Sequence, residues 1–456
     1  MQRGANMENK NVTVEQLKEL IQEKNVQELR RVFNDYNIVD MSELVDQLDM
    51  NGVLFIFKTL KKNITSEIFS YLPYDKQEDL IKAFTGPEIQ EMLDNLYSDD
   101  IVDFMEEMPA NIVKRVLQNI KPARRAEINK LLNYREDSCG SIMNTNYITL
   151  KRNETVLQSI ERLRRLKNID RALGYAYITD TKRELIGSIS LKQLLYLNDD
   201  DKIEDTMDTD LVYVHTNDEQ EKAAHLVQKY DISTIPVIND EGKLAGAITY
   251  DDIIDVIHEE ATEDIHKMSG VTPTDEPYLD TGVWSMYKHR IVWLLVLMIG
   301  ATFTGNILMI FEERLSTVAY LTVFVPMLMD AAGNAGNQSS TMITRALALG
   351  ELKLNDLFKV WLKEFRVAIL CGITMGVVNL LRVLVFMGMV DINTSIIVSI
   401  TVMCTVMVAK LIGCTLPMVA VKLGFDPAVM AGPLITTLVD VVALLIYLGL
   451  ASFFLL

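Results

Sequence analysis

The sequence predicts a multidomain membrane protein with four parts. These are a helical superhelix, an α+β module of two similar copies, a connecting helix and a transmembrane domain of five α-helices. Charge is unevenly divided, since residues 1–280 carry 33 Lys and Arg and 53 Asp and Glu, whereas residues 281–456 carry 11 and 9. An internal repeat occupies 139–260, and five apolar runs follow it. These shifts predict domains at 1–136, 137–250, 251–285 and 286–456.

The acidic first part excludes some classes of partner and site. Its net charge of −20 argues against nucleic acid, because phosphates need basic surfaces. The start of the chain has no apolar core of signal-peptide length, so we expect this part to stay in the cytoplasm. The four cysteines show no paired spacing, so neither a zinc site nor a disulfide framework is expected.

Residues 12–135 read as short amphipathic helices. Thr13 is predicted to cap the first, whose apolar residues fall on one face. Three later units, at 72–84, 85–96 and 98–109, each open with a helix breaker or capping residue. Such repetition is typical of a small helical superhelix. In the third unit, the alternative role of Ser98, Asp99 and Asp100 is to stabilise a helix start.

A two-fold repeat follows. Residues 141–163 parallel 205–227, and residues 175–195 parallel 235–254. Each copy is predicted to form a strand, a helix, a two-stranded hairpin and a further helix.

This repeat resembles a tandem pair of CBS domains, modules that often bind adenine nucleotides between the copies. The resemblance implies that ATP or another adenine nucleotide contacts Thr249 and Asp252. The first copy has Gln193 where the second has its acid, so at most one nucleotide is expected.

The next segment, 250–268, is an acidic helix without an internal breaker. Like charges four residues apart repel on adjoining turns, so we expect a cation to relieve the repulsion. A solvated linker helix is the alternative. Seven carboxylates lie within fourteen positions: Asp251, Asp252, Asp255, Glu259, Glu260, Glu263 and Asp264.

The five apolar spans are predicted at 291–311, 317–345, 364–388, 394–420 and 428–455. Lys and Arg gather on one side of these spans. They are Lys288, Arg290, Arg345, Lys353, Lys359, Lys363, Arg366 and Lys422. The positive-inside rule then predicts a multi-pass protein of the cytoplasmic (inner) membrane, with its N-terminus in the cytoplasm and its C-terminus outside.

Asp440 is the only acid in the last span. A carboxylate at membrane depth costs roughly 3 kcal/mol on insertion scales and is usually kept for an ion or proton path. The alternative is an Asp hydrogen-bonded to a neighbouring helix. Gly432 and Pro433 interrupt the same span about two turns earlier, which we expect to free backbone carbonyls.

The second span carries three carboxamides within five residues, including Asn334, and glycines such as Gly336. Close helix packing alone would account for the glycines. Oxygen-bearing groups on two broken helices instead predict a path for a hard cation. The two broken spans contain neither His nor Cys, the ligands typical of zinc and copper sites, so Mg²⁺, Ca²⁺ or Mn²⁺ is expected. With one acid counted per chain, we expect a homodimer that presents two Asp440 carboxylates to a hydrated ion.

These motifs resemble the MgtE-type magnesium transporter family over nearly the whole chain. The similar segments are PMLMDAAGNAGNQ in the second span, TYDD and EEATEDI in the acidic helix, and FDPAVMAGPLITTLVDVVALLIYLGLA in the fifth. The resemblance implies a homodimeric, Mg²⁺-selective, channel-like pathway in which Asp440 binds the hydrated ion. The pore residues are then Asp440, Asn334, Gly336, Gly432 and Pro433.

The resemblance also implies that the connecting helix acts as a plug, closed by cytosolic Mg²⁺. The matching acids are Asp99 and Asp103, the carboxylates of 251–264, and Asp426.

Two rival readings remain open. One is a transporter of another divalent ion such as Mn²⁺ or Co²⁺. The other is an adenylate sensor that is only tethered to the membrane by its spans. Asp440 and the interrupted second span argue against this reading, because a membrane anchor needs neither feature. The sequence has neither a phosphate-binding loop motif nor a nucleophile–base signature, so we do not predict an enzyme.

Overall fold

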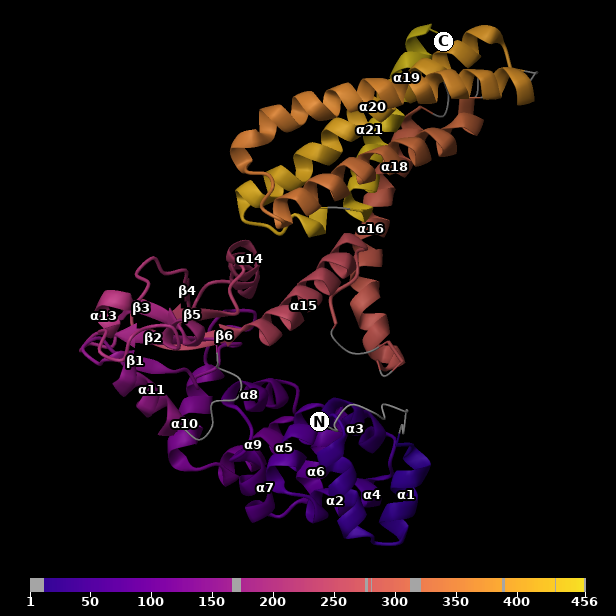
Figure 1. Cartoon of the computed structure of the whole chain (residues 1–456). Coiled ribbons are helices and arrows are strands. Elements are labelled where there is room, and N and C mark those ends of the chain that lie inside the picture. The colour runs from indigo at the N-terminus through magenta and orange to yellow at the C-terminus, as the bar shows by residue number, and fades with distance from the viewer. Residues whose placement is uncertain are drawn as a thin grey trace, which may run out of the picture. The chain divides into compact units, whose positions relative to one another are not determined.

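A computed structural model describes residues 12–165, 174–274, 278–279, 281–311, 321–387, 390–430 and 432–454. The chain divides into two compact units, 1–256 and 257–456. We call them the soluble unit and the membrane unit and take each by itself (Figure 1).

The soluble unit begins, within its described residues, with a row of short helices. Their bounds are α1 Val14–Gln22, α2 Val26–Asp35, α3 Ile38–Asp46, α4 Met50–Thr59, α5 Lys62–Ser70, α6 Tyr74–Ala83, α7 Gly86–Leu93, α8 Ser98–Glu106, α9 Ala110–Asn119 and α10 Pro122–Leu131. Thr13 accepts a hydrogen bond from the Gln16 amide at 3.3 Å, which confirms the predicted cap. The three similar units predicted between 72 and 109 are α6, α7 and α8.

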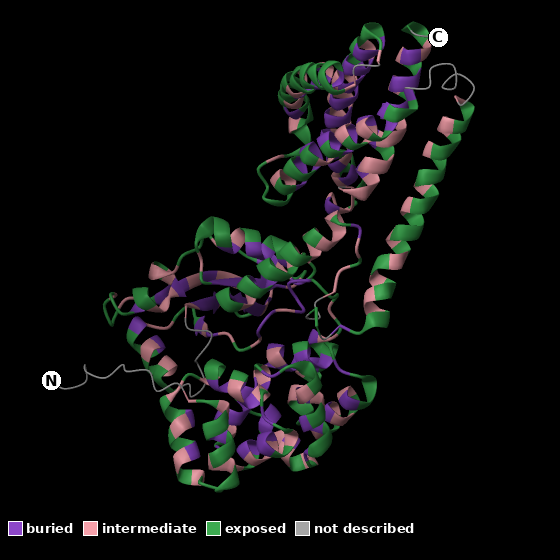
Figure 2. Cartoon of the chain, turned by 90° about the vertical axis from the view of Figure 1, so that its right-hand side faces the viewer, coloured by how far each residue is buried: buried purple, intermediate pink, exposed green. Residues whose placement is uncertain are grey.

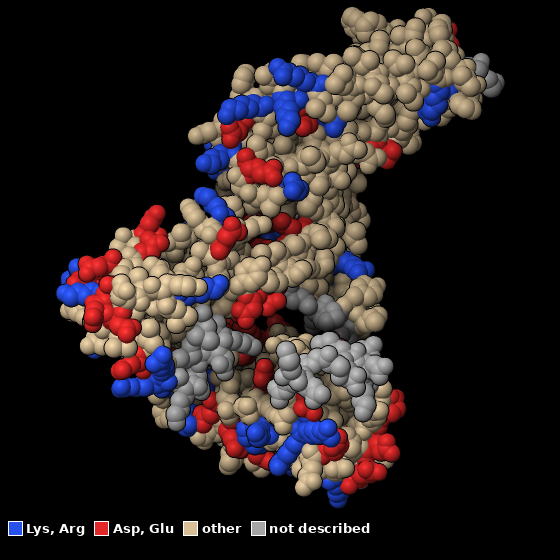
Figure 3. Space-filling model, in the orientation of Figure 1, with Lys and Arg blue, Asp and Glu red and all other residues tan. Residues whose placement is uncertain are grey.

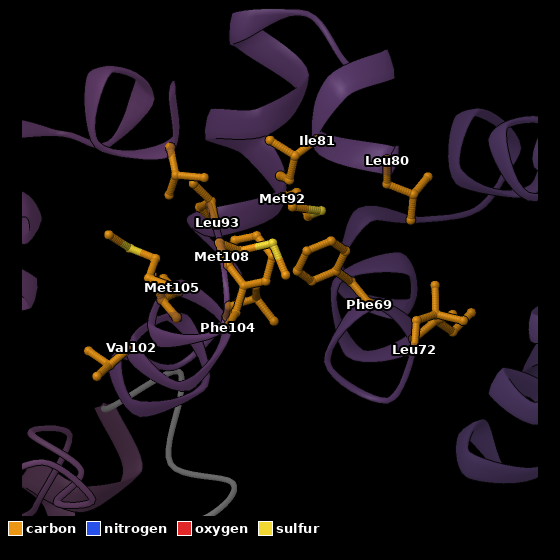
Figure 4. Packing of buried hydrophobic residues seen from close by; sticks show 14 of the residues in the cluster. Phe69, Leu72, Leu80, Ile81, Met92, Leu93, Val102, Phe104, Met105 and Met108 are labelled. Atoms are coloured by element: carbon orange, nitrogen blue, oxygen red, sulfur yellow. The ribbon is translucent and has the colours of Figure 1, made fainter. Parts of the chain in front are cut away.

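A continuous apolar core holds these helices together (Figure 4). Phe69 of α5 meets the edge of Phe104 of α8, with ring centroids 5.2 Å apart. Met92 and Met108 fill the space around this pair. The packing fixes α8, the helix that carries Asp99 and Asp103.

The α+β module contains two three-stranded sheets of the same topology, which confirms the predicted repeat. In each, the first strand runs parallel to the second and the second antiparallel to the third. The first copy holds β1 Thr149–Lys151, α11 Val156–Arg165, β2 Tyr175–Thr179, β3 Leu185–Ser190 and α12 Leu191–Leu194. The second holds α13 Ile203–Thr206, β4 Val214–His215, α14 Gln220–Tyr230, β5 Thr234–Ile238, β6 Leu244–Thr249 and α15 Tyr250–Met268.

The two copies exchange equivalent contacts. A Cβ at Gly246 would lie 2.7 Å from the sulfur of Met143, and a Cβ at Gly187 would lie 2.5 Å from that of Met207. Both glycines are therefore required by close approach of the other copy, as expected of a pseudo-symmetric pair.

Helix α15 covers the whole predicted acidic segment, and the division between the two units falls within it. Ile253 and Val256 are buried in the core of the soluble unit. Ile254 and Ile257 are exposed, so the buried apolar face of α15 is narrow.

The membrane unit consists of long helices. They are α16 Val283–Ile310, α18 Leu321–Ala348, α19 Leu357–Phe386, α20 Ile392–Leu423 and α21 Pro433–Phe454, with short 3₁₀ turns η1 Leu354–Asp356 and η2 Ala428–Met430. Among the described residues, four segments are long and apolar enough to cross a membrane. They correspond to α16, α19 with η1, α20, and α21 with η2.

Helix α18 is as long as a span but falls outside that group, since it carries the carboxamides, glycines and serines noted above. A count of exactly five spans therefore stays a prediction. Of the predicted spans, residues 317–320, 388, 431 and 455 lie outside the described part of the chain.

Helix α18 packs against α20 and α21, and α19 packs against α20. Helix α16 packs on α21 yet has no buried residue (Figure 2). On the face of the membrane unit seen in Figure 3, Lys and Arg gather mainly toward one end of its helices, and much of the remaining surface is uncharged. This distribution is typical of a helical bundle in a bilayer.

Candidate ion pathway and regulatory carboxylates

Glycines bring α18, α20 and α21 into close contact. A Cβ at Gly336 would lie 3.0 Å from Cγ2 of Ile435, and one at Gly413 would lie 2.2 Å from the Gly336 carbonyl oxygen. A Cβ at Gly333 would lie 3.2 Å from Thr436 and 3.8 Å from Oδ1 of Asp440. Close helix packing thus accounts for these glycines, and the same packing places Asp440 beside the backbone of α18.

The interruption before α21 is held by a carboxamide of α18. Gly432 has φ of +54°, a conformation that favours glycine, and α21 begins at Pro433. The Gly432 amide donates a hydrogen bond to Oδ1 of Asn337 at 3.0 Å. Sequence reasoning noted Asn337 only as one of three carboxamides, and the structure shows that it joins the two broken segments.

The carbonyls at this interruption are used within the helix. The Gly432 oxygen accepts from the Thr436 amide at 3.1 Å and from its hydroxyl at 3.3 Å. The Pro433 oxygen accepts from the hydroxyls of Thr436 and Thr437, each at 2.9 Å. Contrary to the expectation of freed carbonyls, Gly432 and Pro433 act here by shaping the turn.

Asp440 is half-buried on α21. Within the described residues its carboxylate has neither a hydrogen bond nor an ion pair, so the alternative of an Asp satisfied by a neighbouring helix does not apply. Its electrostatic neighbour is Asp330, whose like charge opposes it. An unpaired carboxylate at this depth has a vacant capacity for a cation.

Asp330 corrects the expectation of one acid per chain. It lies on α18, is exposed, and accepts a hydrogen bond from Nδ2 of the exposed Asn334 at 3.1 Å. Each chain therefore brings two carboxylates, Asp330 and Asp440, to this region. The signal was present in the segment PMLMDAAGNAGNQ, where Asp330 stands four residues before Asn334.

A second group of charges lies where α15 meets the loop before α21. Lys267 forms ion pairs with Asp426 at 2.7 Å and with Glu263 at 2.5 Å. Burial and the neighbouring Asp426 raise the pKa of Asp264, and these partners raise the pKa of Lys267 despite its partial burial. The structure brings together the predicted Glu263, Asp264 and Asp426. Sequence reasoning missed Lys267.

A third group lies in the soluble unit and contains Asp99, Asp103 and Asp252. Asp99 is only 5% exposed, and its Oδ2 accepts from Nδ2 of Asn144 at 2.9 Å. Its Oδ1 is buried without a hydrogen-bond partner. Burial, with repulsion from Asp100 and Asp252, raises the pKa of Asp99 to about 7.

The Asp103 side chain is exposed at the surface. Desolvation by nearby protein atoms and repulsion from neighbouring acids, mainly Asp99, raise its pKa to about 8. Asp99, Asp103 and Asp252 are therefore close enough to repel one another.

The remaining predicted acids lie along α15. Asp251, Asp255 and Glu259 are exposed, and Glu260 is intermediate. Among the described residues, no three His, Cys, Asp or Glu side chains are arranged to enclose a metal ion.

The two residues predicted to contact a nucleotide, Thr249 and Asp252, are hydrogen-bonded to each other. The Thr249 hydroxyl and amide both donate to Oδ2 of Asp252, the amide at 3.2 Å. This is a capping arrangement at the start of α15. A nucleotide would have to compete with it for both side chains.

Three family descriptions match the chain. "Divalent cation transporter" matches residues 325–450, "MgtE intracellular N domain" matches 36–137, and "CBS domain" matches 139–199 and 203–259.

Relatives match almost end to end. A protein named magnesium transporter MgtE from Thermus thermophilus is 34% identical over 443 residues, covering 95% of this chain and 97% of the relative. One of the same name from Bacillus subtilis is 28% identical, covering 93% and 96%. A crystal structure of the soluble part of a magnesium transporter is 26% identical, with a TM-score of 0.50, and covers 54% of this chain and 98% of that one. These relatives are named as transporters, a function that is not enzymatic. With its α+β module and its unpaired Asp440, the chain belongs to the MgtE family of magnesium transporters.

Proposed function

We propose that the chain conducts Mg²⁺ across the cytoplasmic membrane through a path lined by α18 and α21. The unpaired carboxylate of Asp440 carries this proposal. It lies beside Gly333, where the absence of a side chain lets α21 approach α18 closely, and Asp330 adds a second negative charge nearby. Carboxylates and carboxamides are the oxygen groups that bind a hydrated Mg²⁺.

The path is completed by a second copy of the chain. Asp330, Asn334 and Gln338 are exposed on α18, although this helix packs among apolar spans. Lipid cannot solvate a carboxylate or a carboxamide, so these groups must face protein or water. A homodimer would enclose them and present four carboxylates to the ion.

A hydrated ion suits this arrangement. Mg²⁺ gives up its waters reluctantly, and waters can bridge the ion to carboxylates that do not converge on it. Mn²⁺ and Co²⁺ share the charge and differ in how readily they dehydrate. Selectivity for Mg²⁺ would therefore come from a path that accepts the hydrated ion.

Closure by cytosolic Mg²⁺ is the second element of the proposal. The orphan Oδ1 of Asp99 and the facing acids Asp103 and Asp252 form an electronegative site that a cation would relieve. Glu263, Asp264 and Asp426 form another in the membrane unit. Cytosolic ions that bind the closed arrangement better than the open one would favour closure, so the transported ion would inhibit its own entry.

The direction of flux follows from the membrane potential. A divalent ion moving inward gains about 4.6 kcal/mol at 100 mV, so no nucleotide hydrolysis is required. ATP or another adenine nucleotide remains a predicted regulator at Thr249 and Asp252, where its binding would have to break their mutual hydrogen bond.

Proteoliposomes loaded with a Mg²⁺-sensitive dye test both elements. External Mg²⁺ should enter under an inside-negative potential, and uptake should fall when the lumen facing the soluble unit already holds millimolar Mg²⁺. Mn²⁺ and Co²⁺ uptake, measured in parallel, decides selectivity. Uptake of Mn²⁺ or Co²⁺ in preference to Mg²⁺ would support the rival transporter, and no divalent uptake at all would support the adenylate sensor.

A further inference from the structure

We propose that a pocket between α18, α19 and α20 binds the headgroup of an anionic phospholipid. The pocket has a volume of about 1050 Å³ and is lined by side chains of the membrane unit. Lys410, Lys363 and Arg345 give its lining a positive character, with Glu351 and Glu364 as the acids.

The buried ammonium of Lys410 is the central observation. Lys410 is only 5% exposed, and within the described residues its Nζ has a single partner, Oγ of Ser339, at 3.4 Å. Three N–H donors and a full charge are thus met by one long hydrogen bond. A buried lysine usually has a closer anionic partner, because an uncompensated charge is costly.

The acids of the pocket have direct partners other than the lysines, and Glu364 reaches Lys410 only through Ser339. Glu364 accepts a hydrogen bond from the Ser339 hydroxyl at 2.8 Å, and Glu351 forms an ion pair with Arg345 at 3.7 Å. No carboxylate of the described residues lies within 4.0 Å of Lys410 or of the exposed Lys363. Lys410 and Lys363 therefore have no carboxylate in direct contact, which leaves their N–H donors available to an anion in the pocket.

Carboxamides of the proposed ion path, Asn334, Asn337 and Gln338, line one part of the pocket. The apolar part of the lining favours an amphiphile over a free ion. Met342, Ile343, Val360 and Val367 contribute apolar walls, and Met342 is 65% exposed. An acyl chain could lie along this surface while the phosphate meets the lysines. Basic pockets between membrane helices on the positively flanked side are typical sites for anionic lipids.

A tryptophan next to the pocket indicates its depth in the membrane. Trp361 lies on α19 two residues before Lys363, is 45% exposed, and donates its indole N–H to Thr415 at 2.8 Å. Partly exposed tryptophans mark the level of the membrane interface. Lys363 is therefore near the headgroups, and Lys410 lies deeper, where a phosphate drawn into the pocket would reach it.

Native mass spectrometry of the purified full-length chain tests the proposal. The protein is equilibrated with equal amounts of phosphatidylglycerol and phosphatidylcholine, and bound lipids are counted. Wild type should retain phosphatidylglycerol preferentially. Lys363→Gln, on an exposed side chain, and Lys410→Met should each weaken that retention about fivefold. Lys422→Gln, on the exposed end of α20, is the matched control and should behave as wild type.

Each other outcome overturns the proposal. Equal retention in all variants means that the lysines do not hold the lipid. Displacement by millimolar inorganic phosphate, with the same dependence on both lysines, means that the ligand is a free anion. Dissociation of a dimer in Lys363→Gln, with no lipid preference in wild type, means that a second copy covers the pocket. Tryptophan fluorescence checks folding, because Trp284, Trp293 and Trp361 all lie in the membrane unit.

Discussion

Replacing Asp99 by Asn should stabilise helix α8 when no Mg²⁺ is present. Asp99 is buried, and one of its oxygens has no hydrogen-bond partner. Asn is neutral, has nearly the same shape, and can still accept the hydrogen bond that Asn144 donates. The change therefore removes a buried charge and leaves the packing in place.

The size of the effect follows from the pKa of Asp99, which rises from 3.8 to about 7 in the folded chain. A raised carboxyl pKa means that ionisation opposes folding. The penalty is absent below pH 3.8, grows as pH rises toward 7, and is constant above. The shift corresponds to at most about 4 kcal/mol at pH 8 and less than about 2 kcal/mol at pH 5.

Hydrogen exchange of the α8 amides in the full-length protein measures this locally. At pH 8, Asp99→Asn should slow exchange by at least about tenfold, since 1.4 kcal/mol is a factor of ten, and the gain should shrink at pH 5. Asp240→Asn is the control, because Asp240 is exposed in the hairpin turn between β5 and β6. Added Mg²⁺ should protect α8 in wild type and in Asp240→Asn more than in Asp99→Asn.

Faster exchange in Asp99→Asn than in wild type at pH 8 would refute the reasoning, because it would mean that the carboxylate stabilises α8 without a cation. Equal protection by Mg²⁺ in all three proteins would show that Asp99 takes no part in ion binding.

Two further substitutions test the membrane unit. Gly413→Ala should cost about 3 kcal/mol or more, since its Cβ would lie 2.2 Å from a backbone oxygen of α18. Gly449→Ala, with nothing within 4 Å, should cost little, and similar thermal stabilities of the two by tryptophan fluorescence would contradict the packing described. Lys267→Met should leave Asp426 without its ion pair and raise the Mg²⁺ dependence of hydrogen-exchange protection in α15. Lys359→Met is the control for Lys267→Met, because it removes an exposed ion pair. If the two variants show the same Mg²⁺ dependence of protection in α15, the Lys267 ammonium does not take the place of a bound cation beside Asp426.

Much of the fold could be predicted because its signals are local. The 19 residues of α15 follow from an unbroken helical pattern between two turns, and the repeated hairpins follow from similar segments. Asp440 was identified because an acid in an apolar run is costly wherever the chain folds.

The contacts that complete the site were beyond such reasoning. Asp99 meets Asn144, 45 residues away, and Lys267 meets Asp426, 159 residues away. No periodicity records these pairs, because they depend on how separate elements pack. The expectation of free backbone carbonyls at Gly432 and Pro433 was wrong, because threonines in the following turn donate hydrogen bonds to them.

Mg²⁺ flux through Asp440→Asn tests the central claim most directly. The variant and wild type are reconstituted at equal density, with Asp391→Asn as control, because Asn preserves the cap that Asp391 provides for α20. The account predicts that Asp440→Asn loses most dye-reported uptake while wild type and Asp391→Asn remain alike, with unchanged folding by tryptophan fluorescence. Full Mg²⁺ flux in a folded Asp440→Asn protein would mean that the ion does not depend on this carboxylate, and the proposed pathway would be wrong.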